Sequence, residues 1–246
     1  MLDVVISIRG ALQPFGYNRG MRLSIIIPTL NEAQNIEATL RPLQAMRARA
    51  VEIIVVDGGS TDGTCERAMP LVDQLLQTVP GRATQMNVGG NAAVGETLLF
   101  LHADSQLPER ADVLIDCALA TPPAHWGRFD VNISGRHVML PIIAWFMNQR
   151  SRLTGIATGD QGIFMRRETF LRVGGFPQQL LMEDVEFSRR MGKQCMPVFI
   201  AARITTSGRR WEKHGVWRTI WLMWRLRWQY SRGTSAAEIH RAYYGK

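Results

Sequence analysis

The chain has 246 residues, enough for one large domain or two small ones with a substantial buried core. Its apolar fraction of 46% and charged fraction of 20% are ordinary for a globular protein and exclude a wholly disordered chain. The three cysteines, Cys65, Cys117 and Cys195, are far apart and form no CxxC pair. This pattern argues against a disulfide framework or a structural zinc site, and it fits a reducing compartment.

The formal net charge of +8 is concentrated in one region of the chain. Residues 203–232 hold eight arginines and lysines against a single acid, Glu212, together with five of the seven tryptophans. The rest of the molecule is close to neutral. The basic character therefore belongs to this segment rather than to the whole surface.

The first twenty residues do not have the pattern of a signal peptide. Asp3 and Arg9 interrupt what would have to be a continuous apolar stretch, and no small-residue cleavage site follows. Met21 then opens the sequence MRLSIIIPT, which resembles a natural start. We therefore expect residues 1–20 to be an upstream translation extension or a loosely attached arm.

The next part of the chain, up to Asp104, alternates strand patterns with helical patterns. Continuous apolar runs predict strands buried on both faces. Asn31 is a candidate cap for the first helix, with Gln34 as its capping-box partner. Strands that alternate with helices predict a parallel sheet with right-handed crossovers. The predicted strands are 23–27, 52–56, 73–79 and 97–101, and the predicted helices span 31–47, a short segment after Thr61 or Asp62, and 82–94.

After Asp104 the pattern is less regular. The run VMLPIIAWFM at 138–147 is apolar for ten residues, which is too short to span a bilayer. The sequence contains no internal repeat, low-complexity tract or linker that would separate independent domains. The remaining predicted elements are a helix near 108–119, an edge strand at 127–134, the segment GIFMRRETF at 162–170, an acidic helix at 183–191, a strand at 195–200, and two helices at 211–230 and 235–244.

Four acidic segments carry the functional signal of this sequence. IIIPTLNE (25–32), VVDGGSTDGT (55–64) and LLFLHADS (98–105) each place an acid just after a predicted buried strand, and LMEDVEFSRR (181–190) opens a predicted helix. Acids that follow parallel strands collect at the carboxyl edge of the sheet, where open α/β sheets bind their ligands. Several carboxylates in one crevice would suit a divalent cation with its phosphates, and a general base.

Together with Gly-Arg-x-x-Gln-x-Asn at 81–87 and the GGF…MED…R block, these motifs resemble an inverting family 2 glycosyltransferase of the GT-A fold. The resemblance covers residues 22 to about 200, and five motifs agree in order and spacing. It implies an α/β fold with a mostly parallel sheet. The implied organisation is a GT-A domain at 21–205, with a nucleotide-binding half at 21–105 and an acceptor half at 106–205, followed by basic, tryptophan-rich helices at 206–246.

The resemblance implies a nucleotide-sugar donor, with a UDP-sugar favoured. A buried carboxylate such as Asp57 can accept a hydrogen bond from a uracil imide N–H, and the glycine pair after it lets a flat ring approach the backbone. Taken singly, Asn31 and Asp57 could equally be a helix cap and a turn residue. Arg82 could equally be a surface arginine at a helix start, a place that favours anions. The implied donor-binding residues are Pro28, Thr29, Asn31, Glu32, Asp57, Arg82 and Asp104.

The metal-binding motif departs from the family pattern. Where the family has Asp-x-Asp, this chain has His102-Ala103-Asp104. The resemblance assigns Asp104 to a divalent cation, Mn²⁺ or Mg²⁺, which would neutralise the leaving nucleotide. His102 has three interpretations: a ribose contact, a nitrogen ligand that favours manganese, or a satisfied buried histidine. His214 is a further candidate ligand from the carboxyl end.

The resemblance places the catalytic base in the pair Glu183-Asp184. An inverting transfer needs a carboxylate that deprotonates the acceptor hydroxyl while the sugar carbon is attacked opposite the leaving phosphate. Asp184 is favoured as the base and Glu183 as an acceptor contact or an orienting contact; Glu186 stands where the family often has aspartate. Alternatively, the acids only complement the dipole of a helix start. Asp160 and Gln161 are candidate acceptor-side residues.

Tryptophan repeats at helical spacing in the basic segment. At about 100° per residue, Trp217, Trp221, Trp224 and Trp228 fall on one stripe with arginines on both flanks. Such a stripe suits a helix within 211–230 that lies at the headgroup level of a membrane. Core packing or a homodimer seam would give the same spacing. The expected location is therefore cytoplasmic, either free or peripheral at the inner face of the membrane.

The sequence leaves the sugar and the acceptor open. The HAD variant and the C-terminal RRW…YY pattern resemble a small cytosolic bacterial subgroup, some members of which lie near radical-enzyme pathways that include arsenosugar formation. That likeness implies a small-molecule acceptor, whereas the tryptophan stripe would suit a lipid-linked one.

Two other classes of function compete with glycosyl transfer. One is a non-catalytic module that uses the basic helix on a membrane or on nucleic acid, but no nucleic-acid fold signature is found and we expect no such partner. The other is a sugar-phosphate nucleotidyltransferase, whose typical glycine-rich loop after the first strand is replaced here by PTLNE.

Overall fold

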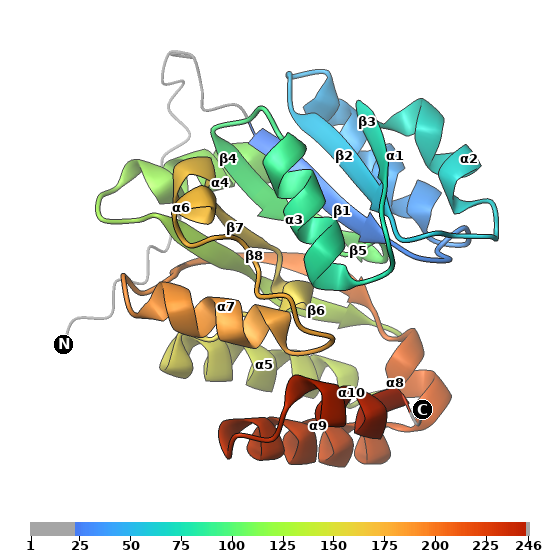
Figure 1. Cartoon of the computed structure of the whole chain (residues 1–246), viewed down its shortest axis with the longest axis vertical. Helices are drawn as coiled ribbons and strands as arrows, with labels where there is room; N and C mark the ends of the chain where they lie inside the picture. The colour runs from blue at the N-terminus through green and yellow to red at the C-terminus, as the bar shows by residue number, and fades with distance from the viewer. Residues whose placement is uncertain (1–22, 245–246) are drawn as a thin grey trace.

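The computed structural model describes residues 23–244, which form one eight-stranded sheet with helices on both of its faces (Figure 1). The predicted extension at 1–20 lies outside the described residues. The strands are β1 (Leu23–Thr29), β2 (Glu52–Asp57), β3 (Gln74–Gln77), β4 (Thr97–Phe100), β5 (Ser105–Gln106), β6 (Trp126–Ser134), β7 (Ile163–Arg166) and β8 (Val198–Ser207). The helices are α1 (Ile36–Arg47), α2 (Thr64–Ala68), α3 (Arg82–Ala92), α4 (Ala111–Ala120), α5 (Leu140–Thr154), α6 (Arg167–Arg172), α7 (Glu183–Gly192), α8 (Arg209–His214), α9 (Val216–Ser231) and α10 (Ala236–Tyr244), with short 3₁₀ turns η1 (Met69–Leu71) and η2 (Gly159–Gln161).

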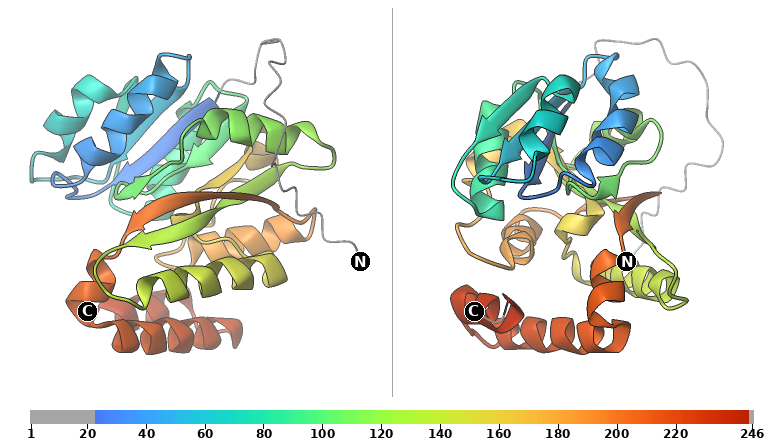
Figure 2. Two further views of the ribbon diagram at one scale, coloured as in Figure 1. Left: turned by 180° about the vertical axis from the view of Figure 1, so that it is seen from behind. Right: turned by 90° about the vertical axis from the view of Figure 1, so that its right-hand side faces the viewer.

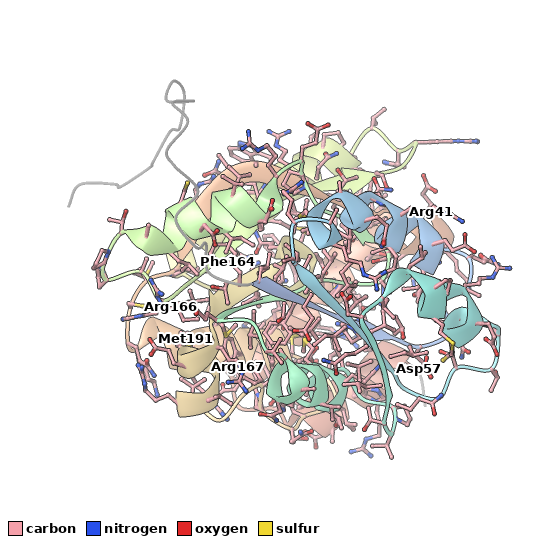
Figure 3. All side chains as sticks on the ribbon, turned by 90° about the horizontal axis from the view of Figure 1, so that it is seen from above. Arg41, Asp57, Phe164, Arg166, Arg167 and Met191 are labelled. Carbon is pink, nitrogen blue, oxygen red and sulfur yellow. The ribbon has the colours of Figure 1, made fainter. Side chains whose placement is uncertain are left out.

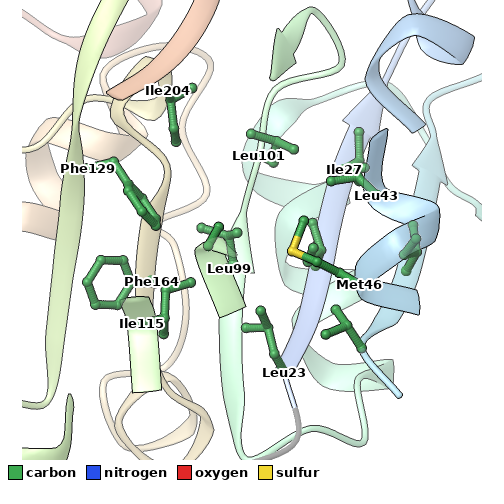
Figure 4. Packing of buried hydrophobic residues seen from close by; sticks show 14 of the residues in the cluster. Leu23, Ile27, Leu43, Met46, Leu99, Leu101, Ile115, Phe129, Phe164 and Ile204 are labelled. Carbon is green, nitrogen blue, oxygen red and sulfur yellow. The ribbon is translucent and has the colours of Figure 1, made fainter. Parts of the chain in front are cut away.

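The first half of the sheet is parallel, in the order β3-β2-β1-β4, and confirms the predicted alternation of strands and helices. Neighbouring residues of β1 face opposite sides: Ile27 packs in the same cluster as Leu43 of α1, and Ile26 in the same cluster as Met86 of α3. Figure 4 shows the first of these clusters. Because both faces are covered, the strands are apolar throughout, and their carboxyl ends share one edge.

The second half of the sheet is mixed; the strand predicted at 127–134 is present as β6, but its predicted position at the edge of the sheet is wrong. Strand β7 runs antiparallel to both β4 and β6, and β6 lies between β7 and β8. Arg128 is fully buried and pairs with the buried Asp130, so two charges are satisfied inside the sheet. The predicted strand at 195–200 also begins later and runs further, as β8.

A two-residue strand that the sequence did not reveal ties the two halves together. Strand β5 pairs antiparallel with β8, with Ser105 opposite Thr206, and the two side-chain hydroxyls lie 3.1 Å apart. This pairing holds the loop after β4, which carries His102 and Asp104, against the last strand. The carboxyl-terminal half of the chain therefore shapes the donor side of the sheet edge.

The predicted cap of the first helix is also wrong. Helix α1 begins at Ile36, well after Asn31, and Asn31 has a left-handed backbone with φ of 54°. The Asn31 N–H donates to Ser60 Oγ at 2.8 Å, and its side-chain oxygen accepts from the Thr61 N–H at 3.0 Å. Asn31 therefore joins the loops after β1 and β2 instead of capping a helix.

The helix predicted at 211–230 is two helices, α8 and α9, separated at Gly215, whose φ is 82°. Helices α9 and α10 lie side by side at one end of the molecule, beyond α5 and α7, and the views of Figure 2 agree. Leu226 of α9 is fully buried in a cluster with Val185 of α7 and Ile239 of α10. The C-terminal helices thus pack behind the helix that opens with the Glu-Asp pair. In the described part of the chain, no helix is both long and apolar enough to cross a bilayer.

Candidate active site

The loops after the parallel strands, the turn η2 and the first turn of α7 meet at one pocket. Figure 3 labels Asp57 at the carboxyl end of β2 and Met191, in the last turn of α7, on the other side of the molecule. Helix α7 therefore directs its amino terminus toward the carboxyl edge of the sheet. The pocket is lined by Pro28, Arg82, Met86, Phe100, Leu101, His102, Gly159, Ile163, Phe176, Glu183 and Asp184.

Asp57 orders the loop that follows β2. Its side chain is fully buried, and one carboxylate oxygen accepts from the N–H groups of Gly59 and Ser60, both at 2.8 Å. The other oxygen accepts from the hydroxyls of Ser60 and Thr29. Burial raises the pKa of Asp57, but the hydrogen bonds from Ser60 and Gly59 outweigh it and hold the pKa below its ordinary value. A uracil imide would reach this carboxylate only by displacing a hydroxyl.

Glu32 and Asp104 are bridged by an arginine that sequence analysis did not single out. Arg209 Nη2 lies 3.1 Å from Glu32 Oε2 and 3.4 Å from Asp104 Oδ2. Arg209 opens α8, so the C-terminal basic segment reaches the acids of the donor loops. The RRW motif was the available signal, but its partners lie 177 and 105 residues earlier in the chain, which no local pattern reveals.

His102 lies among the charged groups of the site. Its ring is largely buried, and Nε2 has no hydrogen-bond partner among residues 23–244. The interpretation of His102 as a buried histidine whose hydrogen bonds are all satisfied is therefore wrong. A Cβ added at Gly159 would lie 2.3 Å from this nitrogen, so only glycine leaves room for the ring. Burial, and then the charge of Arg82, lower the pKa of His102 to about 4, although Asp104 and Asp184 oppose the shift. The imidazole is therefore neutral at pH 7.

Helix α7 begins with two adjacent acids in different surroundings. Asp184 accepts hydrogen bonds from the N–H groups of Gly159 at 2.9 Å and Val185 at 2.7 Å. The Glu183 side chain is only 3% exposed, and its Oε1 lies 3.5 Å from Arg82 Nη1. Burial and then the charge of Asp184 raise the pKa of Glu183, while Arg82 opposes the shift. Of the two, the more accessible Asp184 is the carboxylate placed to accept a proton.

The two residues predicted on the acceptor side have different positions. Asp160 is 40% exposed, with Oδ1 3.5 Å from Nδ1 of His102. Gln161 is fully buried; its Oε1 accepts from the Thr158 N–H at 3.2 Å, and its Nε2 donates to Asn148 at 3.3 Å. Asp160 therefore faces the site, whereas Gln161 holds the turn η2 in place and is not free to contact an acceptor.

The acidic and histidine side chains of the site fit a cation that binds together with a substrate. In the described chain they do not form a complete set of protein ligands for a metal ion. Within the described chain no group of three or more His, Cys, Asp or Glu side chains could hold a metal ion. Mg²⁺ typically takes one or two carboxylates and completes its shell with substrate phosphates and water. Asp104 offers such a carboxylate, and the unpartnered Nε2 of His102 is a further donor on the same loop. The side chain of His214 lies outside what the structure describes.

The sequence profile of glycosyl transferase family 2 matches residues 24–174, and the chain belongs to this family. The match runs from β1 to the end of α6. It includes the loops that carry Asp57, His102 and Asp104, and it ends before the Glu-Asp pair of α7.

Solved structures confirm the predicted α/β fold of GT-A type. The mannosyltransferase PcManGT from Pyrobaculum calidifontis, in complex with GDP-Man and Mn²⁺, aligns with a TM-score of 0.59 at 25% identity, covering 76% of this chain and 56% of that chain. S. aureus TarS 1-349 in complex with UDP-GlcNAc aligns with a TM-score of 0.63 at 19% identity, covering 76% and 58%. Both proteins are longer than the part they share with this chain.

The chain also matches only part of the length of each curated relative. An uncharacterized glycosyltransferase of Haemophilus influenzae is 28% identical over 176 residues, which is 67% of this chain and 60% of that protein. Succinoglycan biosynthesis protein ExoA of Rhizobium meliloti is 31% identical over 196 residues, 69% of this chain and 57% of that protein. A PGL/p-HBAD biosynthesis glycosyltransferase of Mycobacterium bovis is 41% identical over 98 residues, 37% and 38% of the two chains. The chain thus spans no more than 60% of the length of these relatives.

Proposed function

We propose that this protein transfers a sugar from a nucleotide-sugar to an acceptor hydroxyl, with inversion at the sugar carbon. Its family membership and its likeness to a mannosyltransferase solved with GDP-Man support the donor class. The observation that carries the proposal is the pocket that Arg82, His102 and Asp184 line together, with Asp104 two residues from His102 on the same loop. An anion-binding group, a candidate cation ligand and a candidate base thereby share one site.

The nucleotide would bind at the loops after β1 and β2. Thr29, Asn31 and Glu32 come from the first loop, and Asp57 closes the second strand. Ser60 joins the two loops, since it accepts from the Asn31 N–H and donates to Asp57. This cradle is preformed, which lowers the entropy lost on binding. A UDP-sugar is the donor that we propose, with the uracil imide taking the place of the Ser60 hydroxyl on Asp57.

The diphosphate would lie between Arg82 and Arg209. Asp104 would hold a divalent cation, Mn²⁺ or Mg²⁺, with His102 as the second candidate ligand. When bound, the cation supplies positive charge that stabilises the leaving nucleoside diphosphate. Two arginines would add further positive charge beside the diphosphate. Arg209 lies 3.4 Å from Asp104, and Arg82 lies 3.5 Å from Glu183.

Asp184 would remove the proton from the acceptor hydroxyl. The Gly159 N–H fixes one carboxylate oxygen, and the helix N–H of Val185 fixes the other, so the group is oriented before an acceptor arrives. Buried Glu183 orients Arg82 rather than taking the proton itself. Asp160, exposed at the same turn, is the acceptor-side residue that we retain.

A thermal-shift panel of nucleotides and nucleotide-sugars with Mn²⁺, Mg²⁺ or EDTA tests the donor site. A ligand at a hundredfold its dissociation constant adds about 2.7 kcal/mol, a shift of roughly 5–11 °C for a chain of this size. We expect one nucleotide class to stabilise the protein and EDTA to remove the effect. A flat response to every nucleotide would contradict the proposed donor. Once an acceptor is known, the anomeric configuration of the product, measured by NMR, tests inversion.

A further inference from the structure

Four tryptophans on one side of α9 are exposed to solvent. The exposed fractions are 69% for Trp217, 62% for Trp221, 74% for Trp224 and 55% for Trp228. A single exposed apolar side chain is ordinary, but a contiguous row of indole rings marks an interaction surface. The opposite side of α9 packs on the protein through buried Leu226. Core packing within the described chain therefore does not explain the stripe.

Arginines border this row, and α9 contains no acidic residue. The guanidinium of Arg225 lies 5.0 Å from the ring centre of Trp221, and that of Arg232 lies 4.2 Å from the ring of Trp228. Such pairs present positive charge and aromatic surface together. This combination is complementary to anionic lipid headgroups above an apolar interior, where tryptophan is enriched.

A second group of exposed apolar side chains lies at the same end of the molecule. Helix α5 buries one side against Val216 at the start of α9, and it exposes Ile142, Trp145 and Phe146 by 45%, 55% and 61%. Figure 2 shows α5 and α9 next to each other at this end. Helix α9 has 16 residues, about 24 Å at 1.5 Å per residue, which is too short to span a bilayer but suits a helix lying in its surface.

We propose that α9 docks the protein on a bilayer that contains anionic phospholipid, with its four tryptophans at the headgroup level. Leu226 packs against the α7 residue Val185, and α7 opens with Asp184. Docking would therefore bring the acceptor side of the site close to the membrane surface, where a lipid-linked hydroxyl is available.

Flotation with vesicles tests the docking surface on the full chain. Vesicles of phosphatidylcholine alone and vesicles with added phosphatidylglycerol are compared at low and high salt. We expect binding to the anionic vesicles, weakened by salt. The double substitution Trp221→Ala/Trp224→Ala should reduce partitioning by about tenfold or more, because it removes two of the inserted aromatic rings.

The matched control is Met69→Ala/Val79→Ala, which removes two apolar side chains that are 62% and 68% exposed in the donor half. It should bind vesicles as the unmodified protein does. Absence of vesicle binding, or equal binding by the tryptophan variant, overturns the proposal. Sedimentation equilibrium without lipid gives a separate check: a dimer that the tryptophan variant abolishes would identify a second copy as the occupant and also overturn it.

Two arginines near the site carry buried N–H groups that have no hydrogen-bond partner in the described chain. This feature is separate from the exposed tryptophans of α9. Nε and Nη2 of Arg150, in α5, and Nε of Arg227, in α9, are buried and have no hydrogen-bond partner in the described chain. Burying a charged donor without an acceptor is unfavourable. A bound anion would satisfy these groups.

The surroundings of Arg150 connect this pair to the site. Burial, and then the charge of Arg227, lower the pKa of Arg150 to about 10, while Asp184 and Asp160 oppose the shift. The guanidinium is therefore still positive at pH 7. The two arginines act on each other, and Arg150 is within electrostatic reach of the candidate base and of the acceptor-side acid.

We infer that Arg150 and Arg227 form an anion subsite for a phosphate group on the acceptor, next to Asp184. This inference rests on the proposed function. Guanidinium groups bind phosphate oxygens through paired N–H donors, which would satisfy the nitrogens that lack partners. The chemistry is the same for a soluble phosphate ester and for a lipid phosphate.

Calorimetric titration with nucleotide present tests the subsite, using glycerol 3-phosphate, glycerol and dodecyl phosphate as probes. We expect a phosphate ester to bind and glycerol not to bind. Arg150→Gln and Arg227→Gln should each weaken binding by about tenfold, whereas Arg218→Gln, on the exposed side of α9, should not change it. Binding of glycerol 3-phosphate supports a soluble acceptor, and binding of dodecyl phosphate alone supports a lipid one.

The inference is overturned if both arginine variants bind the probes as the unmodified protein does, or if glycerol binds as well as its phosphate. The nucleotide-induced thermal shift should be unchanged in both variants. That second measurement separates failure of the subsite from failure of the proposed function, since the latter would remove the nucleotide response from the unmodified protein as well.

Discussion

The loops after β1 and β2 and the buried arginines of the acceptor side differ in how far their polar groups are satisfied. In the donor half, Asp57 accepts four hydrogen bonds, and Glu32 is paired with Arg209 at 3.1 Å. On the acceptor side, Arg150 and Arg227 have buried nitrogens without partners among residues 23–244. A satisfied network is preformed, whereas donors without partners can still pair with a ligand. The donor half is therefore suited to bind the nucleotide-sugar first. The acceptor would then bind second and pair with the donors that lack partners.

This difference predicts that substitutions in the two halves change different measurements. Variants of the donor half should alter nucleotide affinity or the stability of the fold. Variants of the acceptor half should alter turnover and leave nucleotide binding intact.

The largest effect is expected for Asp184→Asn. The amide keeps the shape of the side chain but cannot accept the acceptor proton, so turnover should fall by about 10²–10⁴-fold. The nucleotide-induced thermal shift should stay the same, because Asp184 is bound to the turn at Gly159 and not to the donor loops. Turnover is measured by release of nucleoside diphosphate.

The matched control is Glu186→Gln, two residues further along α7. Glu186 pairs with Arg190 at 3.3 Å on the helix surface, and a surface pair of this kind contributes little. Its turnover should be close to that of the unmodified protein. If Asp184→Asn retained full turnover, the base would have to be another group and the division between the halves would fail.

The next largest effect is expected for Asp57→Asn. The amide nitrogen would face hydrogen-bond donors, either the N–H groups of Gly59 and Ser60 or the hydroxyls of Ser60 and Thr29. A buried donor left without an acceptor costs about 1–3 kcal/mol. Urea unfolding at pH 7 should show a loss of this size, together with weaker nucleotide binding. The exposed Glu66→Gln serves as control and should change stability by less than about 0.5 kcal/mol. Unchanged stability in Asp57→Asn would mean that the loop is not held by this carboxylate.

A smaller and more selective effect is expected for Asp104→Ala. If Asp104 holds the cation that accompanies the diphosphate, nucleotide affinity should fall about tenfold, or 1.4 kcal/mol, when Mn²⁺ or Mg²⁺ is present. In EDTA the variant should lose no affinity, because without a cation the carboxylate does not attract the diphosphate. Arg209→Gln sharpens the test: it should weaken nucleotide binding with EDTA as well as with metal, because its own charge does not depend on the cation. Equal binding by Asp104→Ala in metal would place the cation elsewhere.

The sequence predicted the donor half well because its signals are local. Continuous apolar runs such as 23–27 and 52–56 became β1 and β2, and the acids after them reached one edge of the sheet. Where the prediction was wrong, contacts with residues far away in the sequence determine the local structure. Asn31 binds the loop after β2 instead of capping α1, and its partner Thr61 lies 30 residues away. Such contacts leave no trace in helical or strand periodicity.

The acceptor half was harder to predict because it buries charge. Strand β6 was predicted at an edge of the sheet, yet it is an inner strand in which Arg128 and Asp130 satisfy each other's charge. The role of Arg209 was missed because its acids lie in two earlier loops. The GT-A fold could be predicted from the motifs, whereas the polar contacts between the halves required the structure.

The smallest effect is expected for Asp116→Asn, on α4 and away from the site residues of both halves. Burial, followed by the charges of Asp112 and Glu96, raises the pKa of Asp116 to about 6 from 3.8. The folded protein therefore holds this proton more tightly than the unfolded chain, and stability falls as pH rises from about 4 to about 6. Because the side chain is only partly buried, the cost above pH 6 is discounted to about 1 kcal/mol, or roughly 2–4 °C. Thermal melts should show Asp116→Asn more stable than the unmodified protein at pH 7.5 but not at pH 4, without a change in nucleotide affinity. A gain that is the same at both pH values would show that the charge of Asp116 is not its cause.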